Sequence, residues 1–468
     1  MSVKPLVMKF GGTSVADAAA MRRLINHVVR ARELGDRPVV VVSALGGVTN
    51  ELFRAASVAA EGSEAAESIL DGLKARHLEL TTQVSSDRRD EVSRAIEQQF
   101  DELRAVVRAI VTLKDASPRA LDAIAAAGEL LSSRIVDSAL SAAGIPSAWI
   151  DPRRLVITND DYTQASPLFE AIDTAVIREL EPVLSADRVP VTAGYVGATA
   201  QGVATTLGRG GSDYSAALIG AALRAREIQI WTDVDGMLTA DPRIVGAPQV
   251  VPKLSFGEAS ELAYFGAKVL HPSTILPAVA RDIPVRILNS RRTGGSGTLI
   301  ASQEVASERD GIAAIACKRG ITVIDITSTR MLMAYGFLRR VFEVFERHRT
   351  SVDVVTTSEV SVSVTVDDDR RLKAVITDVS EFAEVRSESG MAILCAVGDV
   401  LRQDAHLAAR VLGALDGFPL RMVSQAASRR NVTVVLRDAD VPSAMSQLHD
   451  LFFARNESDR PQTEAVSS

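Results

Sequence analysis

The sequence has few cysteines and no long apolar runs, and each shortage excludes a class of protein. The 468 residues include only two cysteines, Cys317 and Cys395, both within apolar stretches. We therefore expect buried free thiols in a reducing compartment rather than a disulfide framework. No apolar stretch approaches the roughly 18–20 residues that a membrane-spanning helix needs, and the first residues carry no signal-peptide pattern. We expect a cytoplasmic protein that makes no contact with a membrane.

The sequence also has no excess of positive charge, no metal-ligand pattern and few aromatic residues. The formal net charge is −7, which disfavours nucleic-acid binding because a phosphate backbone requires a basic surface. The six histidines are scattered and no CxxC or HExxH pattern occurs, so we expect no metal site built by the protein alone. Hydrophobic residues make up 47% and aromatic residues 4%, which is typical of a globular protein with closely packed, helix-rich layers. At about 100–200 residues per domain, the length indicates two to four domains.

The first 300 residues alternate short apolar strands with helices. Residues 5–10 are expected to form a buried strand that runs into a glycine turn, followed by a helix at 15–34 and a strand at 39–43. This order is typical of a parallel sheet with crossover helices, so we expect a three-layer α/β sandwich with a mainly parallel sheet over residues 1–300. The remaining elements are expected to be helices over 51–143, with an insertion at about 60–115, and strands at 147–150, 189–193, 228–232 and 283–288.

The pattern changes near residue 300. Charged residues and a glycine at 301–315 indicate a linker. After it, the order strand, helix, strand, strand, helix occurs twice, which predicts a tandem repeat of a small ferredoxin-like α+β module. We expect the two modules at 315–385 and 390–455, followed by a disordered polar tail at 456–468.

A first glycine turn, KFGGTS at residues 9–14, follows the first expected strand. Glycines let the backbone approach a ligand closely, and amides at the start of the next helix can hold an anion. Lys9, at the end of the strand, would direct its ammonium to the same place. This combination suits a transferring phosphoryl group, for which catalysis is mostly positioning and charge neutralisation. A tight turn with a surface lysine is the alternative.

A second glycine-rich stretch, TLGRGGSD at 206–213, places an arginine between glycines. Ser212 and Asp213 are expected to cap the helix that follows. A turn alone does not explain Arg209, whereas a guanidinium can grip a carboxylate by two parallel hydrogen bonds. Asp213 is also placed to orient Lys9 by an ion pair. The sequence has no GxxxxGK[ST] motif, and this stretch fails the GxGxxG pattern at Asp213, so we expect a phosphoryl-transfer enzyme outside the P-loop class.

Polar residues in three other stretches support this interpretation. In WTDVDG at 231–236, Thr232 and Asp233 follow a strand, where open α/β sheets bind ligands, although a simple Asp/Gly turn would look the same. Lys268 lies in the apolar segment FGAKVLHP, where an unpaired ammonium would be costly. Glu129 lies in an apolar helix, either at its solvated edge or as an acceptor for a substrate ammonium.

Taken together, these stretches resemble a known family. The sequence is similar to aspartate kinases of the amino acid kinase superfamily, and SVDVVTTSEVSV at 351–362 resembles the paired ACT domains of that family. The resemblance extends from residue 4 to about 455 and is greatest to the lysine-sensitive, homo-oligomeric branch. It rests on motifs in this order: KFGGTS (9–14), SALGGVTN (43–50), GEL (128–130), TLGRGGSD (206–213), WTDVDG (231–236), DPR (241–243) and FGAKVLHP (265–272).

The resemblance implies a reaction and a set of site residues. ATP and L-aspartate would give ADP and 4-phospho-L-aspartate, the first step toward lysine, threonine and methionine, with Mg²⁺ carried by ATP. Lys9 and Lys268 would neutralise the phosphoryl group, while Asp213 holds the lysines in place. The implied ATP-binding residues are Lys9, Phe10, Gly11, Gly12, Thr232, Asp233, Leu238, Arg243, Lys268 and Val269. The implied substrate-binding residues are Ser43, Ala44, Thr49, Glu129, Tyr195, Arg209, Gly210, Gly211 and Ser212.

The resemblance also implies regulation by an amino acid and assembly through the ACT domains into a homodimer or homotetramer. Lysine is expected as the effector in preference to threonine. Asp353 and Glu359 would accept its ammonium, unless both are solvated loop residues. A kinase for glutamate-type substrates and a catalytically silent amino-acid sensor remain alternatives. The implied effector-binding residues are Met331, Ala334, Gly336, Phe337, Leu338, Asp353, Thr357, Ser358 and Glu359.

Overall fold

In the computed structural model the chain divides into two compact units, which are described separately. Unit 1 comprises residues 1–237 and 269–306, and unit 2 comprises residues 238–268 and 307–468. No helix in the described part of the chain is long and apolar enough to cross a lipid bilayer. The structure describes residues 3–266, 270–302, 311–328, 335–401, 404–425 and 430–454, so the tail predicted at 456–468 lies outside it.

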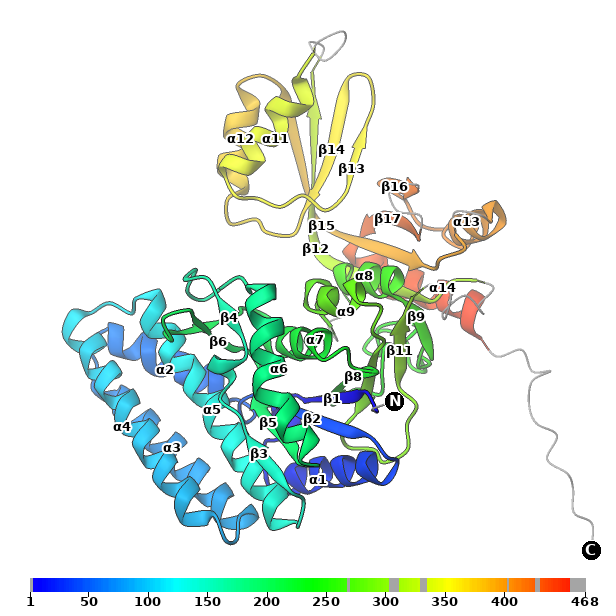
Figure 1. The fold of residues 1–468 in the computed structure, drawn as a ribbon. Coiled ribbons are helices and arrows are strands. Elements are labelled where there is room, and N and C mark those ends of the chain that lie inside the picture. The colour runs from blue at the N-terminus through cyan, green and yellow to red at the C-terminus, as the bar shows by residue number, and fades with distance from the viewer. Residues whose placement is uncertain are drawn as a thin grey trace, which may run out of the picture. The chain divides into compact units, whose positions relative to one another are not determined.

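A mainly parallel sheet forms the centre of unit 1 (Figure 1). Within this unit its strands follow the order β3-β5-β2-β1-β8-β10-β11, and only β11 runs antiparallel to its neighbour. The expected α/β class and the expected strands are confirmed. The bounds are β1 (Pro5–Phe10), β2 (Arg37–Val42), β3 (Ser147–Trp149), β5 (Val189–Ala193), β8 (Glu227–Thr232), β10 (Val285–Asn289) and β11 (Thr298–Ala301).

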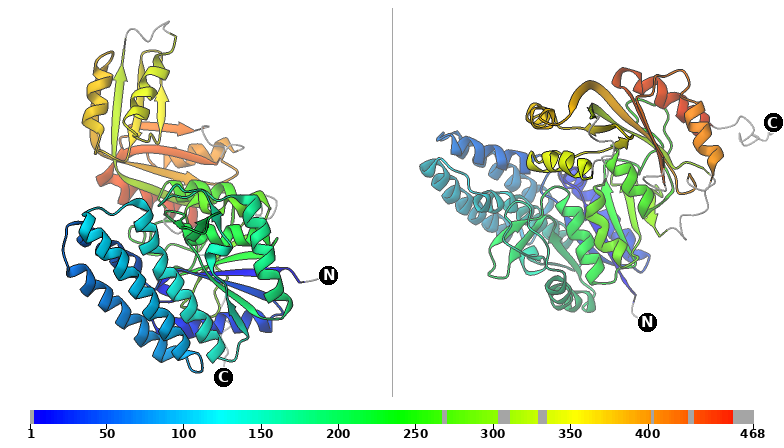
Figure 2. Two further views of the ribbon diagram at one scale, coloured as in Figure 1. Left: turned by 60° about the vertical axis from the view of Figure 1, so that its left-hand side comes forward. Right: turned by 90° about the horizontal axis from the view of Figure 1, so that it is seen from above.

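Helices cover both faces of this sheet (Figure 2), because alternate residues of each strand point to opposite sides. Leu6, Met8 and Phe10 of β1 pack in one core with α1 and with helices α2 to α5. Val7 points to the other face, where it approaches Gly220 of α7. The bounds are α1 (Ala18–Glu33), α6 (Phe169–Ser185), α7 (Gly211–Ala222) and α9 (Leu276–Ala280), with short 3-10 turns at Gly12–Ser14, Pro152–Arg154 and Pro272–Ile275.

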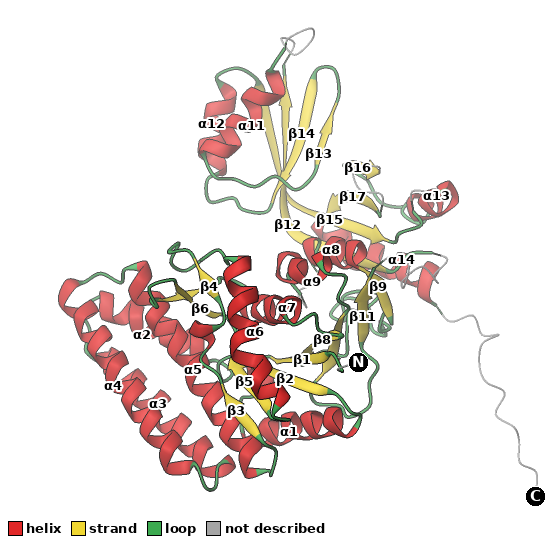
Figure 3. Ribbon diagram, viewed as in Figure 1, coloured by secondary structure: helices red, strands yellow, loops and turns green. Residues whose placement is uncertain are grey.

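The helical layer predicted over residues 51–143 is present as four helices (Figure 3). Gly128 of α5 lies close to the loop after β2 and to α2. A Cβ at Gly128 would lie 3.1 Å from the Cβ of Ala44 and 3.2 Å from a side-chain carbon of Leu52. A larger residue would therefore push α5 away from that loop. The bounds are α2 (Val48–Ala60), α3 (Ala65–Val84), α4 (Arg89–Leu113) and α5 (Pro118–Ala142).

A small second sheet in unit 1 was not predicted. Its strands follow the order β4-β6-β7, with β4 parallel to β6 and β7 antiparallel to β6. Strands of two to four residues are too short to show a period-two pattern, so sequence periodicity does not reveal them. The bounds are β4 (Ile157–Thr158), β6 (Val196–Thr199) and β7 (Ala204–Thr206).

Unit 2 contains a six-stranded antiparallel sheet in the order β13-β14-β12-β15-β17-β16. The predicted order of strand, helix, strand, strand, helix is confirmed twice along the chain. The second helix of the first module begins at Leu372. The bounds are β9 (Lys253–Ser255), α8 (Phe256–Tyr264), β12 (Ala314–Thr327), α11 (Phe337–Arg347), β13 (Val355–Thr357), β14 (Ser361–Val366), α12 (Leu372–Ser380), β15 (Glu384–Val397), α13 (Ala405–Gly413), β16 (Met422–Gln425), β17 (Asn431–Arg437) and α14 (Val441–Phe453), with a 3-10 turn at Asp438–Asp440.

The two hydrophobic cores of unit 2 are nested rather than consecutive along the chain. Ile315, in the first half of β12, packs in one core with Leu394 and Leu448. Ile324, in the second half of β12, packs in the other core with Val341. Strands β12 and β15 therefore both run through both modules, and the β12–β15 register shifts between residues 319 and 323. Gly320 (φ +73°) and Gly390 (φ +76°) occupy the left-handed region where each long strand passes from one core to the other.

Candidate active site

The end of β1 places Lys9 beside α7. All six residues of β1 are buried, and the amide of Gly11 donates a hydrogen bond to the carbonyl of Trp231 at 3.1 Å. The Lys9 ammonium lies 2.5 Å from the carboxylate of Asp213, and both side chains are largely buried. The expected ion pair is therefore present, in a setting where water screens it little.

The glycines around Arg209 have a specific geometric role. Gly208 (φ +73°) and Gly210 (φ +72°) are both left-handed, a conformation that costs glycine little. The expectation that Ser212 and Asp213 cap α7 is wrong: the N-cap is Gly210, and no side chain caps this helix end. Asp213 lies within the first turn instead, which leaves its carboxylate free to pair with Lys9.

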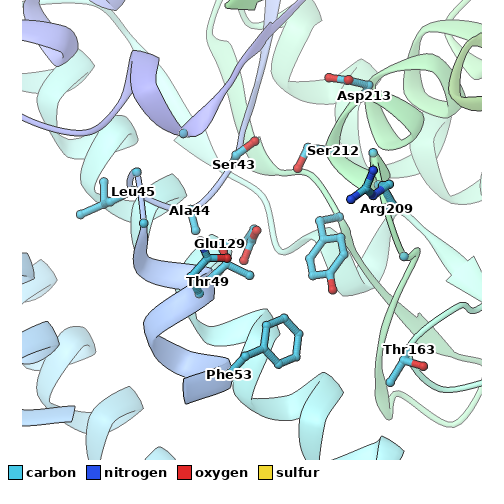
Figure 4. Close-up of a pocket in the computed structure, with 18 of the residues that line it drawn as sticks. Ser43, Ala44, Leu45, Thr49, Phe53, Glu129, Thr163, Arg209, Ser212 and Asp213 are labelled. Carbon is cyan, nitrogen blue, oxygen red and sulfur yellow. The ribbon is translucent and has the colours of Figure 1, made fainter. Parts of the chain in front are cut away.

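Arg209 is exposed and makes no ion pair or hydrogen bond to another residue in the described part of the chain. Ser212 lies in the first turn of α7, directly after this loop. Figure 4 shows Arg209 and Ser212 on one side of a pocket, with Thr49 and Glu129 on the other. An exposed arginine without a partner among the described residues is available to bind an anion that enters from solvent.

Glu129 is a buried carboxylate on α5, only 4% exposed. Its burial raises the pKa to about 8, although hydrogen bonds from the backbone amides of Ala44 and of Glu129 itself act in the opposite direction. The Oε2 atom is buried and has no hydrogen-bond partner among the described residues. Such a group is costly in a folded protein unless a ligand completes its partners, and a cation is the natural one.

These groups line one cavity of about 750 Å³ within unit 1. All nine residues predicted to bind substrate line this cavity, together with Lys9, Gly12 and Asp213. Asn50 neighbours the predicted Thr49 and continues the same motif, so the sequence carried a signal for it. Thr163 and Gln164 belong to no motif, so no sequence signal pointed to them. The lining residues that were not predicted are Leu45, Gly46, Gly47, Asn50, Phe53, Leu121, Thr163, Gln164 and Gly208.

The residues expected to bind nucleotide are distributed differently. The side chain of Phe10 is fully buried and stacks on Trp231 at 5.8 Å between ring centroids, so it faces the hydrophobic core. Thr232 ends β8, and its hydroxyl donates to Asp233 at 3.3 Å. Leu238 and Arg243 belong to unit 2, where Arg243 pairs with Asp241 at 2.5 Å. Lys268 and Val269 lie outside the described residues.

The predicted effector residues that the structure describes lie in three segments of one module of unit 2. Gly336 (φ +83°) is the N-cap of α11, which begins with Phe337 and Leu338. Thr357 ends β13, and Ser358 and the exposed Glu359 form the turn to β14. Met331 and Ala334 lie outside the described residues.

Asp353 is not a solvated loop residue, since only 2% of its side chain is exposed. Its Oδ1 accepts hydrogen bonds from the Lys318 ammonium at 2.7 Å and from the Tyr264 hydroxyl at 2.9 Å. Its Oδ2 is buried without a hydrogen-bond partner among the described residues. One oxygen of this carboxylate is thus already bound by the chain's own ammonium, a contact that sequence motifs do not reveal.

Comparison with known proteins agrees with this geometry. Residues 4–289 match the model of the amino acid kinase family, and residues 394–452 match an ACT domain model. Aspartokinase 2 of the Arabidopsis thaliana chloroplast is 38% identical over 96% of this chain and 84% of its own length. The chain belongs to the aspartokinase family. As an aspartokinase it is a phosphotransferase with an ACT regulatory region.

Solved aspartokinases show the same fold. The crystal structure of Escherichia coli aspartokinase III with aspartate and ADP, in the R-state, has a TM-score of 0.79 and 34% identity, and the match covers 96% of this chain and 99% of that one. The structure of the same enzyme with lysine and aspartate, in the T-state, has a TM-score of 0.80 and 35% identity over the same shares.

Proposed function

We propose that unit 1 transfers the γ-phosphoryl group of ATP to the side-chain carboxylate of L-aspartate, giving ADP and 4-phospho-L-aspartate. The main observation is that one cavity is lined by the guanidinium of Arg209 and by the buried carboxylate of Glu129. Among the described residues, the guanidinium has no partner and the carboxylate has one oxygen without a hydrogen bond. These are complementary to the α-carboxylate and the α-ammonium of an amino acid. A substrate held by both groups has its side-chain carboxylate free to react.

The transfer step requires no general base, because a carboxylate is already ionised at neutral pH. One of its oxygens forms a bond to the γ-phosphorus, while the bond from that phosphorus to the bridging oxygen breaks and ADP leaves with the electron pair. Lys9 neutralises charge on the transferring group, joined by Lys268. The backbone amide of Gly12 would donate to the same oxygens, whereas the amide of Gly11 already donates to the carbonyl of Trp231. Asp213 holds Lys9 in position.

Mg²⁺ fits this arrangement as a partner of ATP. It favours oxygen ligands and keeps several waters, so phosphate oxygens can supply much of its coordination. Asp213 is a carboxylate that lines the cavity, which makes the donor set compatible with a hard cation. When bound, the ion would neutralise charge on the phosphates.

The remaining predicted residues complete the proposed site. Ser43, Ala44, Thr49, Tyr195, Gly210, Gly211 and Ser212 would contact aspartate along the cavity wall. The nucleotide would contact Phe10 through its backbone, together with Thr232, Asp233, Leu238, Arg243 and Val269. We propose a catalytic domain over residues 1–300 with a helical insertion at about 60–115. We also propose the ACT domains predicted at 315–385 and 390–455, with the correction that the first half of β12, including Ile315, packs in the core of the second domain.

We propose feedback inhibition by an end-product amino acid, lysine in preference to threonine, within a homodimer or homotetramer formed through the ACT domains. The lysine complex of the E. coli relative supports this choice. The effector residues would be Met331, Ala334, Gly336, Phe337, Leu338, Asp353, Thr357, Ser358 and Glu359. For Asp353 to accept an effector ammonium, either its free Oδ2 is used or Lys318 leaves its Oδ1.

The test is ADP release from MgATP with L-aspartate, with L-glutamate as the competing substrate. L-Lysine and L-threonine are then added separately and together. We expect turnover with aspartate only, and inhibition by lysine. Turnover with glutamate instead of aspartate would favour a glutamate-type kinase, and ligand binding without turnover would favour a silent sensor. Turnover with aspartate that lysine does not inhibit would support the proposed reaction and show that lysine is not the effector.

The raised pKa of Glu129 predicts a pH dependence for aspartate binding. With a pKa of about 8, the carboxyl group of the free enzyme is neutral at lower pH and cannot pair with an ammonium. We therefore expect kcat/KM for aspartate, at saturating MgATP, to rise by about tenfold per pH unit up to pH 8 and to level off above it. Glu129→Gln should lower the value and remove the slope. A flat wild-type profile between pH 6.5 and 8 would contradict the raised pKa of Glu129, and an unchanged kcat/KM in Glu129→Gln would contradict its role in binding the ammonium.

A further inference from the structure

Asp122 is a buried carboxylate of α5 that the proposed reaction does not use. It is 1% exposed and precedes Glu129 by seven residues, so the two side chains lie on the same face of the helix, two turns apart. Burial raises the pKa of Asp122, while hydrogen bonds from Thr206 and Thr163 lower it. No sequence motif singles it out, because an aspartate in a long helix is ordinary.

The contacts of Asp122 join two separate segments of the cavity wall. The amide of Thr163 donates to both carboxylate oxygens, at 3.1 and 3.0 Å. The amide of Thr206 donates to Oδ2 at 3.1 Å, and the Thr206 hydroxyl donates to Oδ1 at 2.6 Å. The two segments are also joined directly, since the amide of Ala165 donates to the carbonyl of Thr206 at 2.9 Å.

Both segments lead to residues that line the cavity. Thr206 ends β7 and is three residues before Arg209. The next amide, of Leu207, donates to the carbonyl of Tyr195 at 3.0 Å. Thr163 (φ +75°) and Tyr195 (φ +67°) are non-glycine residues in the left-handed region, and both line the cavity. Strained residues of this kind persist only where their surroundings hold them firmly, and Asp122 supplies that hold for Thr163.

We infer that Asp122 is a positioning residue for the amino-acid substrate: it fixes the Thr163 turn and the end of β7, and so sets where Arg209 and Tyr195 meet the substrate. This inference rests on the proposed function. Asp122 acts through these residues and touches neither the substrate nor the reacting atoms. Its loss should therefore weaken aspartate binding more than it slows phosphoryl transfer.

The test compares Asp122→Asn with Asp137→Asn in the full-length enzyme. Asparagine keeps the shape of the side chain, but either orientation of its amide sets an N–H₂ group against a backbone N–H of Thr163 or Thr206. Asp137 is a matched control, because it is also on α5, is also 1% exposed, and binds Ser147 and Arg88 rather than the cavity wall. We expect Asp122→Asn to raise KM for L-aspartate about tenfold or more, with kcat within about threefold and KM for MgATP unchanged. Asp137→Asn should leave all three near their wild-type values.

A second pair of variants covers the case in which Asp122→Asn does not fold. Thr206→Val removes one donor to Asp122 at nearly constant volume, and should raise KM for aspartate by a smaller factor. Thr206→Ser keeps the hydroxyl and should therefore have a KM for aspartate near the wild-type value. Wild-type KM for aspartate in both Asp122→Asn and Thr206→Val would overturn the inference, as would a collapse of kcat at unchanged KM. No aspartate-dependent turnover in the wild-type enzyme would instead overturn the proposed function, and the substrate named here with it.

Discussion

Lys9→Met is expected to lower kcat by about a thousandfold, which corresponds to about 4 kcal/mol of transition-state stabilisation. Lys9 is the last but one residue of a fully buried strand, and its ammonium is held 2.5 Å from Asp213 at the wall of the cavity. Charge on a transferring phosphoryl group is spread over its oxygens, and a fixed cation in a site shielded from water stabilises it strongly. Methionine has a similar length and flexibility, so packing around β1 should change little.

The control for this prediction separates catalysis from folding. Lys9→Met leaves the Asp213 carboxylate without its cation, which destabilises the fold independently of the reaction. The double variant Lys9→Met, Asp213→Asn removes both charges and should recover thermal stability without recovering turnover. Lys4→Met changes an exposed lysine just before the same strand and should behave as wild type. Near-wild-type turnover in Lys9→Met would rule out the role given to this ammonium.

Arg209→Ala is expected to lower kcat/KM for L-aspartate by about a thousandfold, since two charge-assisted hydrogen bonds are worth about 4 kcal/mol together. Arg209 has no partner among the described residues, so its removal should leave the melting temperature unchanged. Arg209→Lys keeps the charge but loses the forked geometry, so its kcat/KM should lie between those of the wild type and of Arg209→Ala. Arg119→Ala, at an exposed position near the start of α5, is the matched control.

A substrate analogue sharpens the test of Arg209. β-Alanine is aspartate without its α-carboxylate, and it retains both the ammonium and the reacting carboxylate. If Arg209 binds the α-carboxylate, the wild-type enzyme should prefer aspartate strongly, and Arg209→Ala should remove that preference. The activity with β-alanine itself should not change. An equal loss with both substrates would show that Arg209 acts elsewhere, for example on the phosphates.

The elements that position the site were predictable because their signals are local. The buried run of β1 and the glycines after it mark the end of a parallel strand, and the carboxyl ends of such strands meet at one edge of the sheet. That is why Lys9 and Thr232, far apart in sequence, lie at or next to the carboxyl ends of the neighbouring strands β1 and β8. The ion pair between Lys9 and Asp213 was predictable for the same reason, since α7, which carries Asp213, packs against β1.

Other features depend on contacts between distant segments, which a single sequence does not encode locally. Side-chain chemistry favours Ser212 or Asp213 as a helix cap, yet the pairing with Lys9 takes Asp213 into the first turn and leaves Gly210 at the cap. Asp122 and Lys318 are ordinary residues in their own segments, and they acquire a role only through Thr206 and Asp353. The nesting of the cores in unit 2 is hidden for the same reason, because the order of elements is identical whether the modules are consecutive or interleaved.

The nesting bears on how the regulatory region can be rearranged. The chain leaves one core at Gly320 and re-enters it at Gly390, on adjacent antiparallel strands about 4.8 Å apart. A segment with its ends so close can be inserted into a host, or exchanged for another, at little entropic cost for joining its ends. Residues 321–389 are therefore an insertion in the second module, and we expect that another ACT module joined at these two positions would leave the core of the second module intact.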